Sequence, residues 1–200
     1  MMKARENPFA SCCLHQIPYI PVKMPWREIK GRVESLRYRA AILGPEGSGK
    51  TALLFHLQSL LERRGLETVY LQVYKRNNYL WPFKTKNVQT IDPDKIYLID
   101  GVDLLPAISW FYLRLKMRHA KGLIVSSHKN RWLPVLVHCE TNINLLNDIL
   151  SRLLPNPTES VSSLGEKFFR QRKGNLRDVL RDLYEFYSEM GSCSDSFPSV

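Results

Sequence analysis

The stretch Gly44-Pro45-Glu46-Gly47-Ser48-Gly49-Lys50-Thr51 decides the fold of this chain. It matches the pattern G-x-x-x-x-G-K-[ST] without a mismatch. Residues 39–43 before it are mostly apolar and predict a short buried strand. Residues 50–64 after it predict a helix with leucines on one face and Gly65 as its end. A strand, a glycine-rich loop and a helix in this order predict a phosphate-binding loop.

The residue types of the loop suit an anion. Glycines let the backbone curl so that successive N–H groups point inward, and the start of the helix adds a partial positive charge. We expect Lys50 to reach the β- and γ-phosphates of a nucleotide and the Thr51 hydroxyl to bind Mg²⁺. The alternative is a chance match in a glycine-containing turn, which both flanking elements disfavour.

Composition and charge limit the class of protein. The 200 residues, 44% of them hydrophobic, suit one domain or a core with a small appendage. The net charge of +10 predicts an anionic partner, with nucleic acid ahead of a membrane surface. No apolar run suits a signal peptide or a membrane span, so we expect a soluble, cytoplasmic protein. The cysteines lack zinc-like spacing, which favours free thiols in a reducing compartment.

The chain around the first strand and helix is less regular. Several prolines in residues 1–25 predict an extended arm, and residues 26–36 predict a helix. After a strand over 69–73, residues 74–91 mix lysine and arginine with aromatic residues and contain no acid. That mixture is typical of a nucleic-acid contact, with cations for phosphates and rings for stacking. A long loop whose aromatic residues pack onto the core is an equally good interpretation.

The second strong signal is the apolar run 96–99, which predicts a buried strand ending in Asp100. An acid at the carboxyl end of a parallel strand lies where open α/β sheets bind their ligands. It can hold Mg²⁺, often through water, in the Walker B role. Because a phosphate-binding loop precedes this strand, we expect Thr51 and Asp100 to hold one magnesium ion.

The middle of the chain predicts one more helix and strand. Pro106 opens a helix that reaches about His119, and residues 121–128 predict a strand that ends in Ser127 and His128. A polar side chain at this end would lie between the phosphate loop and Asp100 and would contact a γ-phosphate. The whole of 104–139 lacks an acid and forms a second basic region. The helix residues expected to face inward are Ile108, Phe111, Tyr112 and Leu115.

The rest of the chain completes the organisation. Residues 134–139 predict a fifth strand, and helices follow over 142–154, 161–172 and 176–190. The predicted fold class is therefore α/β: a P-loop NTPase domain over 26–140, with a five-stranded, mostly parallel sheet flanked by helices. A small helical lid (141–190) and a polar tail (191–200) would follow it.

The last helix opens with Gly174-Asn175-Leu176-Arg177-Asp178. With the phosphate loop and the strand acid, this segment resembles the AAA+ class of P-loop ATPases over about residues 26–190, and within it small helper ATPases of the transposition and helicase-loader kind and STAND switches. The resemblance implies ATP and Mg²⁺ as cofactors and a G-N-x-R segment whose arginine, Arg177, contacts the γ-phosphate as sensor 2. It implies Ser127 or His128 as sensor 1.

Two features depart from that class. The position after Asp100, where AAA+ ATPases usually have Glu, is Gly101, and the nearest acid is Asp103, so we expect slow or absent hydrolysis. The arginine finger has no clear position. Arg131 and Arg152 are candidates, although solvated surface arginines are common.

The sequence therefore predicts an ATP-binding and ATP-hydrolysing switch that acts on a macromolecular partner, DNA among the candidates. A nucleic-acid-binding adaptor with structural ATP and a nucleotide or small-molecule kinase are the alternatives, and a protein partner or homo-oligomer stays open. The predicted catalytic residues are Lys50, Asp100, Asp103 and Arg177, with Thr51 and Asp100 on the metal. The predicted ATP-binding residues are Gly44, Pro45, Glu46, Gly47, Ser48, Gly49, Lys50, Thr51, Ser127, His128 and Arg177.

Overall fold

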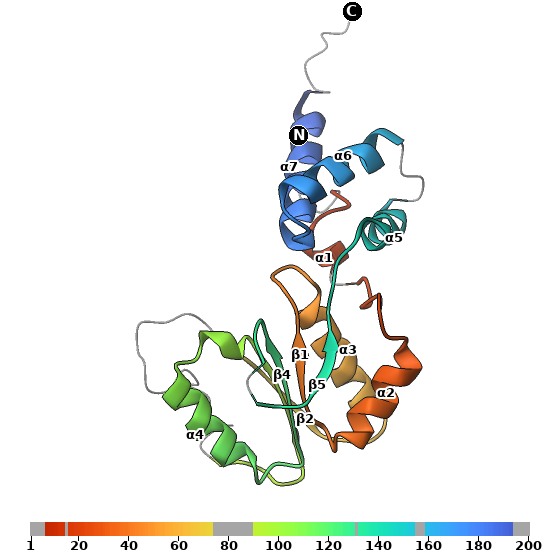
Figure 1. Cartoon of the computed structure of the whole chain (residues 1–200). Coiled ribbons are helices and arrows are strands. Elements are labelled where there is room, and N and C mark those ends of the chain that lie inside the picture. Colours follow the sequence, from red (N-terminus) through yellow and green to blue (C-terminus); the bar gives the residue numbers. More distant parts are fainter. Residues whose placement is uncertain (1–6, 15, 74–89, 131, 155–158, 194–200) are drawn as a thin grey trace, which may run out of the picture. The chain divides into compact units, whose positions relative to one another are not determined.

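A computed structural model describes residues 7–14, 16–73, 90–130, 132–154 and 159–193 of the chain. These residues form two compact units (Figure 1). The sheet unit comprises Lys23–Pro45 and Lys50–Cys139. The helical unit comprises the described parts of Met1–Val22 and Glu140–Val200, together with the loop tip Glu46–Gly49.

The sheet unit is built on five parallel strands in the order β2-β3-β4-β1-β5. The predicted α/β class with a five-stranded sheet is confirmed, and the sheet is parallel throughout. β4 lies between β1 and β3, so the carboxyl ends of these three strands meet at one edge of the sheet. The strands are β1 (Arg39–Leu43), β2 (Thr68–Gln72), β3 (Ile96–Asp100), β4 (Gly122–Ser127) and β5 (Val135–His138).

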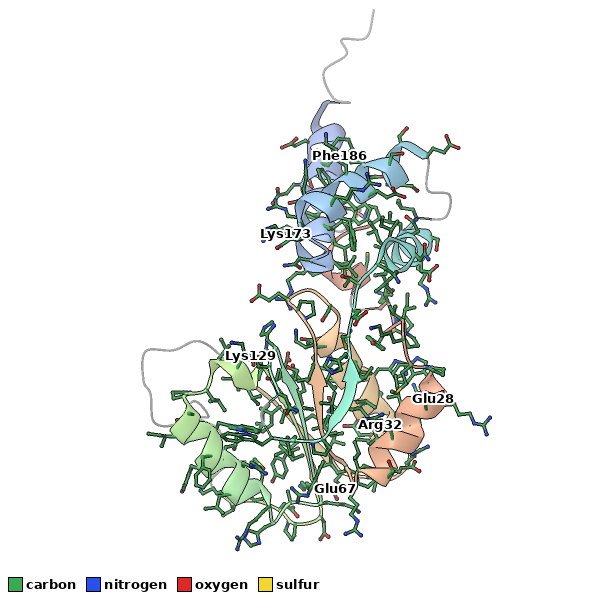
Figure 2. All side chains as sticks on the ribbon, viewed as in Figure 1. Glu28, Arg32, Glu67, Lys129, Lys173 and Phe186 are labelled. Carbon is green, nitrogen blue, oxygen red and sulfur yellow. The ribbon has the colours of Figure 1, made fainter. Side chains whose placement is uncertain are left out.

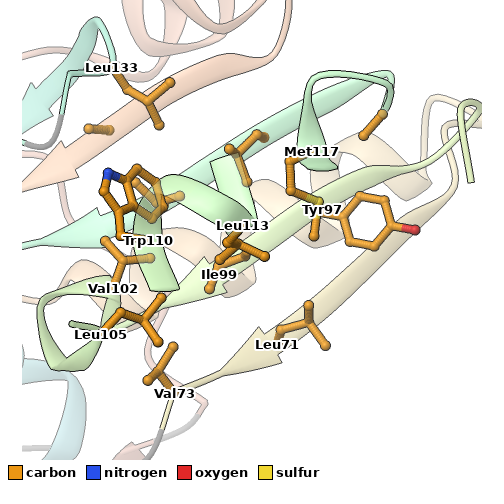
Figure 3. Packing of buried hydrophobic residues seen from close by; sticks show 14 of the residues in the cluster. Leu71, Val73, Tyr97, Ile99, Val102, Leu105, Trp110, Leu113, Met117 and Leu133 are labelled. Carbon is orange, nitrogen blue, oxygen red and sulfur yellow. The ribbon is translucent and has the colours of Figure 1, made fainter. Parts of the chain in front are cut away.

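Helices cover both faces of this sheet, which explains why β3 and β4 are buried along their whole length. α2 (Trp26–Ser35) and α3 (Lys50–Glu62) lie on one face, and α4 (Ala107–Met117) lies on the other (Figure 1). The α4 side is packed by Trp110, Leu113 and Met117 against strand residues such as Tyr97 and Ile99 (Figure 3).

The predicted orientation of α4 is wrong. The residues expected to face inward are exposed, and a neighbouring stripe of the helix, Trp110, Leu113 and Met117, is buried instead. Both stripes are apolar at helical spacing, so periodicity alone could not choose between them. The buried stripe contains Trp110, the largest side chain of the helix, which packs in one core with Tyr97 and Ile99. The exposed residues are Ile108, Phe111, Tyr112 and Leu115.

The helical unit contains α1 (Ser11–Leu14), α5 (Ile143–Leu153), α6 (Glu159–Gln171) and α7 (Leu176–Cys193). Its core includes Phe9, whose ring meets the edge of Tyr187 at a centroid distance of 5.1 Å. The buried Asn7 amide donates to the Tyr184 carbonyl at 2.9 Å. Residues 7–14, expected to be extended, thus contain one helical turn and complete the core of the helical unit.

Candidate functional site

The loop after β1 has the local geometry that its glycines predict. Gly47 and Gly49 adopt φ values of 69° and 84°, which residues with a Cβ rarely adopt. The Lys50 ammonium group donates hydrogen bonds to the carbonyls of Gly44 at 2.7 Å and Pro45 at 2.6 Å. The backbone therefore curls in front of α3, and the lysine cation lies against the start of the loop.

Asp100, at the end of β3, is the centre of the first cluster of polar side chains, which we call the Asp100 corner. Its carboxylate is buried and accepts a hydrogen bond from the Thr51 hydroxyl at 2.8 Å. It also accepts hydrogen bonds from the Tyr70 hydroxyl at 3.2 Å and from the Ser126 hydroxyl. The structure thus brings together Thr51 and Asp100, the two residues predicted to hold a metal ion. Tyr70 and Ser126 were not predicted to lie there.

Asp103 forms a second cluster, the Asp103 corner, in the short 3-10 helix η2 (Val102–Leu104). Its carboxylate accepts a hydrogen bond from the Ser127 hydroxyl at 2.6 Å and from the His128 backbone N–H at 2.7 Å. The two predicted sensor 1 candidates therefore lie at the end of β4, between β1 and β3, and both bind Asp103. Successive residues of a strand face opposite sides, so Ser126 faces Asp100 while Ser127 faces Asp103.

The backbone conformation at position 101 explains why this residue is a glycine. Gly101 adopts φ 80°, and its N–H donates to the Ser126 hydroxyl at 2.8 Å. A side chain in this left-handed conformation costs about 1–2 kcal/mol. The turn that carries the chain from Asp100 into η2 therefore disfavours an acid directly after the strand, and the next acid, Asp103, is tied to β4 instead.

In the helical unit, Asn175 caps α7. Its side chain accepts a hydrogen bond from the Asp178 N–H at 3.3 Å and donates to the Asp178 carboxylate at 2.7 Å. Within the same unit, a Cβ placed on Gly47 would lie 1.9 Å from the Asn175 side-chain oxygen and 3.0 Å from the Arg177 nitrogen. A residue larger than glycine at position 47 would therefore collide with the start of α7.

Arg177, the sensor 2 candidate, is exposed in the first turn of α7. No ion pair within the described residues includes it. Its neighbours differ, since Arg172 binds Asp182 through two hydrogen bonds and Arg181 lies 3.1 Å from Asp178. A cation at the start of a helix is opposed by the helix dipole. Among the described residues, Arg177 therefore has no ion-pair partner such as Arg172 and Arg181 have.

Several predictions cannot be placed fully. Most of the basic segment 74–91 (residues 74–89) and the arginine-finger candidate Arg131 lie outside the described residues. Arg152 is exposed near the end of α5, with no further feature of a finger. The described part of the basic region 104–139 exposes Arg118, Lys121 and Lys129, the last labelled in Figure 2.

The described residues offer few side chains for a metal site made by the protein alone. They contain no group of three or more His, Cys, Asp or Glu side chains that could hold a metal ion. A magnesium ion shared with a nucleotide needs only one or two protein carboxylates, because phosphates and waters supply the other ligands. No helix in the described part of the chain has the length and apolar character to cross a membrane.

Comparison with known proteins gives no assignment. No family model matches the chain, and no curated protein matches it. The function must therefore be inferred from the geometry of the two corners and from the loop.

Proposed function

We propose that this chain binds ATP with Mg²⁺ at the carboxyl edge of its sheet and uses the bound nucleotide as a switch that acts on a macromolecular partner. The observation that carries the proposal is the distance of 2.8 Å between the Thr51 hydroxyl and the Asp100 carboxylate. Neighbouring ligands of an octahedral Mg²⁺ at 2.0–2.1 Å lie about 2.9 Å apart. The two oxygens are therefore spaced like adjacent magnesium ligands, and both are of the type that magnesium prefers.

The loop supports the same proposal. Lys50 supplies a cation at the loop, and its present acceptors, the carbonyls of Gly44 and Pro45, are neutral. A phosphate is a stronger acceptor than a carbonyl because it is charged. Lys50 is therefore positioned to transfer its hydrogen bonds to a phosphate, and the N–H groups at the start of α3 would hold the same anion.

Nucleotide with Mg²⁺ supplies a γ-phosphate whose presence or absence is the signal of a switch. In this proposal the γ-phosphate is contacted by Ser127 or His128, which belong to the sheet unit, and by Arg177, which belongs to the helical unit. Arg177 suits this task because it is an exposed guanidinium group without a described ion-pair partner. The role of Arg177 as sensor 2 follows from the resemblance to AAA+ ATPases.

We propose that hydrolysis of the bound ATP is slow. The position after Asp100 is a glycine with φ 80°, so no carboxylate follows the strand directly. Asp103 is the nearest acid, and each of its oxygens already accepts a hydrogen bond from the end of β4. A carboxylate held in this way is less available to polarise an attacking water, which favours a long-lived ATP-bound state.

ATP binding to Lys50→Ala, measured by isothermal titration calorimetry in Mg²⁺, tests the proposal. Loss of charge-assisted hydrogen bonds worth about 1.5–3 kcal/mol should weaken ATP at least about tenfold and up to about a hundredfold. Lys129→Ala is the matched control, because Lys129 is an exposed lysine just beyond the end of β4. It should bind ATP within about threefold of the wild type. Unchanged affinity in Lys50→Ala, or no ATP binding by the wild type, would contradict the proposed function.

A further inference from the structure

α4 has two apolar faces: one packs on the sheet, and the other is exposed to a large extent. Trp110, Leu113 and Met117 are at most 1% exposed and pack on the sheet. The other face continues from η2 and forms what we call the outer stripe. Its members and their exposed fractions are Leu104 (48%), Ile108 (80%), Phe111 (61%), Tyr112 (47%) and Leu115 (48%).

The outer stripe has the spacing of a helix-binding surface. Ile108, Phe111, Tyr112 and Leu115 occupy positions i, i+3, i+4 and i+7 of α4. Leu104 precedes them in η2, separated from α4 by two residues that are not helical. Along the 11 residues of α4 the stripe runs for about 16 Å. A surface helix normally presents polar residues to water, and a helix that is apolar on both sides normally has a partner on both. Side chains in such rows pack between those of a second helix.

After Asp103, the charged residues along the chain at the stripe are all basic. From Leu104 to Cys139 the sequence contains no acid, while Arg114, Lys116, Arg118 and Lys121 lie along α4 and just after it. Arg118 and Lys121 are exposed, and the Lys116 ammonium group lies 5.1 Å from the centre of the Tyr112 ring. The N-terminal half of the stripe is neutral, and the basic side chains gather toward its C-terminal end.

We propose that the outer stripe binds an acidic amphipathic helix of a protein partner, antiparallel to α4. In this orientation the first turn of the partner helix lies beside the basic end of α4. Acidic residues in a first turn are also favoured by the dipole of their own helix. Tyr112 and Arg118 are of residue types that often dominate the affinity of protein interfaces, and Phe111 is of a type that is enriched in them.

The uneven charge distribution disfavours other occupants. Two copies of the stripe packed in parallel would place the basic ends together, which costs free energy. Packed antiparallel, they would set each basic end against a neutral end, without a charge of opposite sign. A helix that lies on a membrane usually carries basic residues along its whole polar face, whereas here the first two turns of α4 have none. The chain's own segment 74–89, outside the described residues, contains no acid and so does not complement the basic end.

Selection of a random 16-residue peptide library on the whole chain tests the proposal. The double variant Phe111→Ser/Leu115→Ser, exposed at both positions, serves for counter-selection, and its thermal unfolding midpoint checks its fold. We expect the enriched peptides to combine apolar residues at i, i+3, i+4 and i+7 with acids in the first turn. One such synthetic peptide should bind the double variant at least about tenfold more weakly than the wild type. It should bind Phe55→Ser, an exposed aromatic substitution on α3, like the wild type.

Reversing the charge of the basic side chains distinguishes a surface that recognises acidic residues from one that binds any apolar helix. Arg118→Glu/Lys121→Glu should weaken the acidic peptide and strengthen a peptide whose first-turn acids are replaced by lysine. The proposal is overturned if no peptide is enriched, if the enriched peptides carry no excess of acids, or if the double variant binds them as well as the wild type does.

The competing occupants give distinct results. Binding of the wild type, but not of the double variant, to vesicles of phosphatidylserine and phosphatidylcholine would assign the stripe to a membrane. A dimer in light scattering that the double variant abolishes would assign it to a second copy. Peptide binding that appears only after replacement of 74–89 by a Gly/Ser linker would assign it to the chain itself. Each of these results would overturn the proposal.

Discussion

Two carboxylates at the same edge of the sheet, Asp100 and Asp103, follow one strand and have different surroundings. Asp100 is buried and accepts hydrogen bonds from hydroxyl groups of α3, β2 and β4. The Asp103 side chain is 18% exposed and accepts hydrogen bonds from two residues at the end of β4. The Asp100 corner thus joins several elements, whereas the Asp103 corner ties η2 to one strand.

The donor types explain what each corner can do. A hydroxyl such as that of Thr51 has lone pairs and can turn from a hydrogen-bond donor into a magnesium ligand. The Asp103 corner contains one hydroxyl, that of Ser127, and the backbone N–H of His128, which has no lone pair to offer and can only donate. A cation therefore suits the Asp100 corner, and the Asp103 corner suits a fixed connection between η2 and the end of β4.

Apart from substitution of Asp100 itself, we expect the largest difference between the two corners from Asp103→Asn, which should change ATP hydrolysis but not ATP affinity. With its oxygen on the His128 N–H, the amide would donate to the Ser127 hydroxyl, which would then donate only to the Lys129 carbonyl. The negative charge and the direction of the Ser127 hydrogen bond would both change at the end of β4, beside the proposed nucleotide site. We expect single-turnover ATP hydrolysis to slow by about tenfold, equivalent to about 1.4 kcal/mol. ATP affinity should change by less than about threefold, because the Asp100 corner is intact.

Asp92→Asn is the control for that substitution, since the Asp92 side chain is 43% exposed and lies 3.5 Å from Lys95, outside both corners. It should leave both hydrolysis and affinity unchanged. If Asp103→Asn abolishes ATP binding instead, the two corners form one site and the distinction between them is wrong.

A smaller effect is expected from Arg177→Ala in the helical unit. If Arg177 contacts the γ-phosphate, the variant should bind ATP about three- to tenfold more weakly, a difference of about 0.7–1.4 kcal/mol, and ADP as well as the wild type does. Arg181→Ala on the same helix removes an arginine that pairs with Asp178 and should leave both affinities unchanged. Equal effects of Arg177→Ala on ATP and ADP in fluorescence titrations would exclude a γ-phosphate contact.

Much of the sheet unit could be predicted from the sequence because its signals are local. Apolar runs predict the strands, and the loop pattern predicts where β1 ends and α3 begins. The proximity of Thr51 and Asp100 followed from one rule, that carboxyl ends of parallel strands share an edge.

What was missed depends on contacts between distant residues. Which hydroxyls face Asp100 depends on strand register: Gln72 pairs with Asp100, so Tyr70 lies two residues back on the same side. The choice between two apolar stripes of α4 depends on competition for one sheet face. Phe9 completes a core made of residues after 140, and nothing near it in the sequence indicates that contact.

The most direct test of the central claim is the Mg²⁺ dependence of ATP binding, measured by calorimetry with Mg²⁺ and with EDTA for the wild type and Asp100→Asn. We predict that Mg²⁺ strengthens ATP binding to the wild type by at least about tenfold, or about 1.4 kcal/mol, and that this gain disappears in Asp100→Asn. Thermal unfolding should show that the variant is folded, and Asp103→Asn should keep the gain. An equal gain from Mg²⁺ in the wild type and in Asp100→Asn would contradict the assignment of Thr51 and Asp100 as a magnesium–nucleotide site.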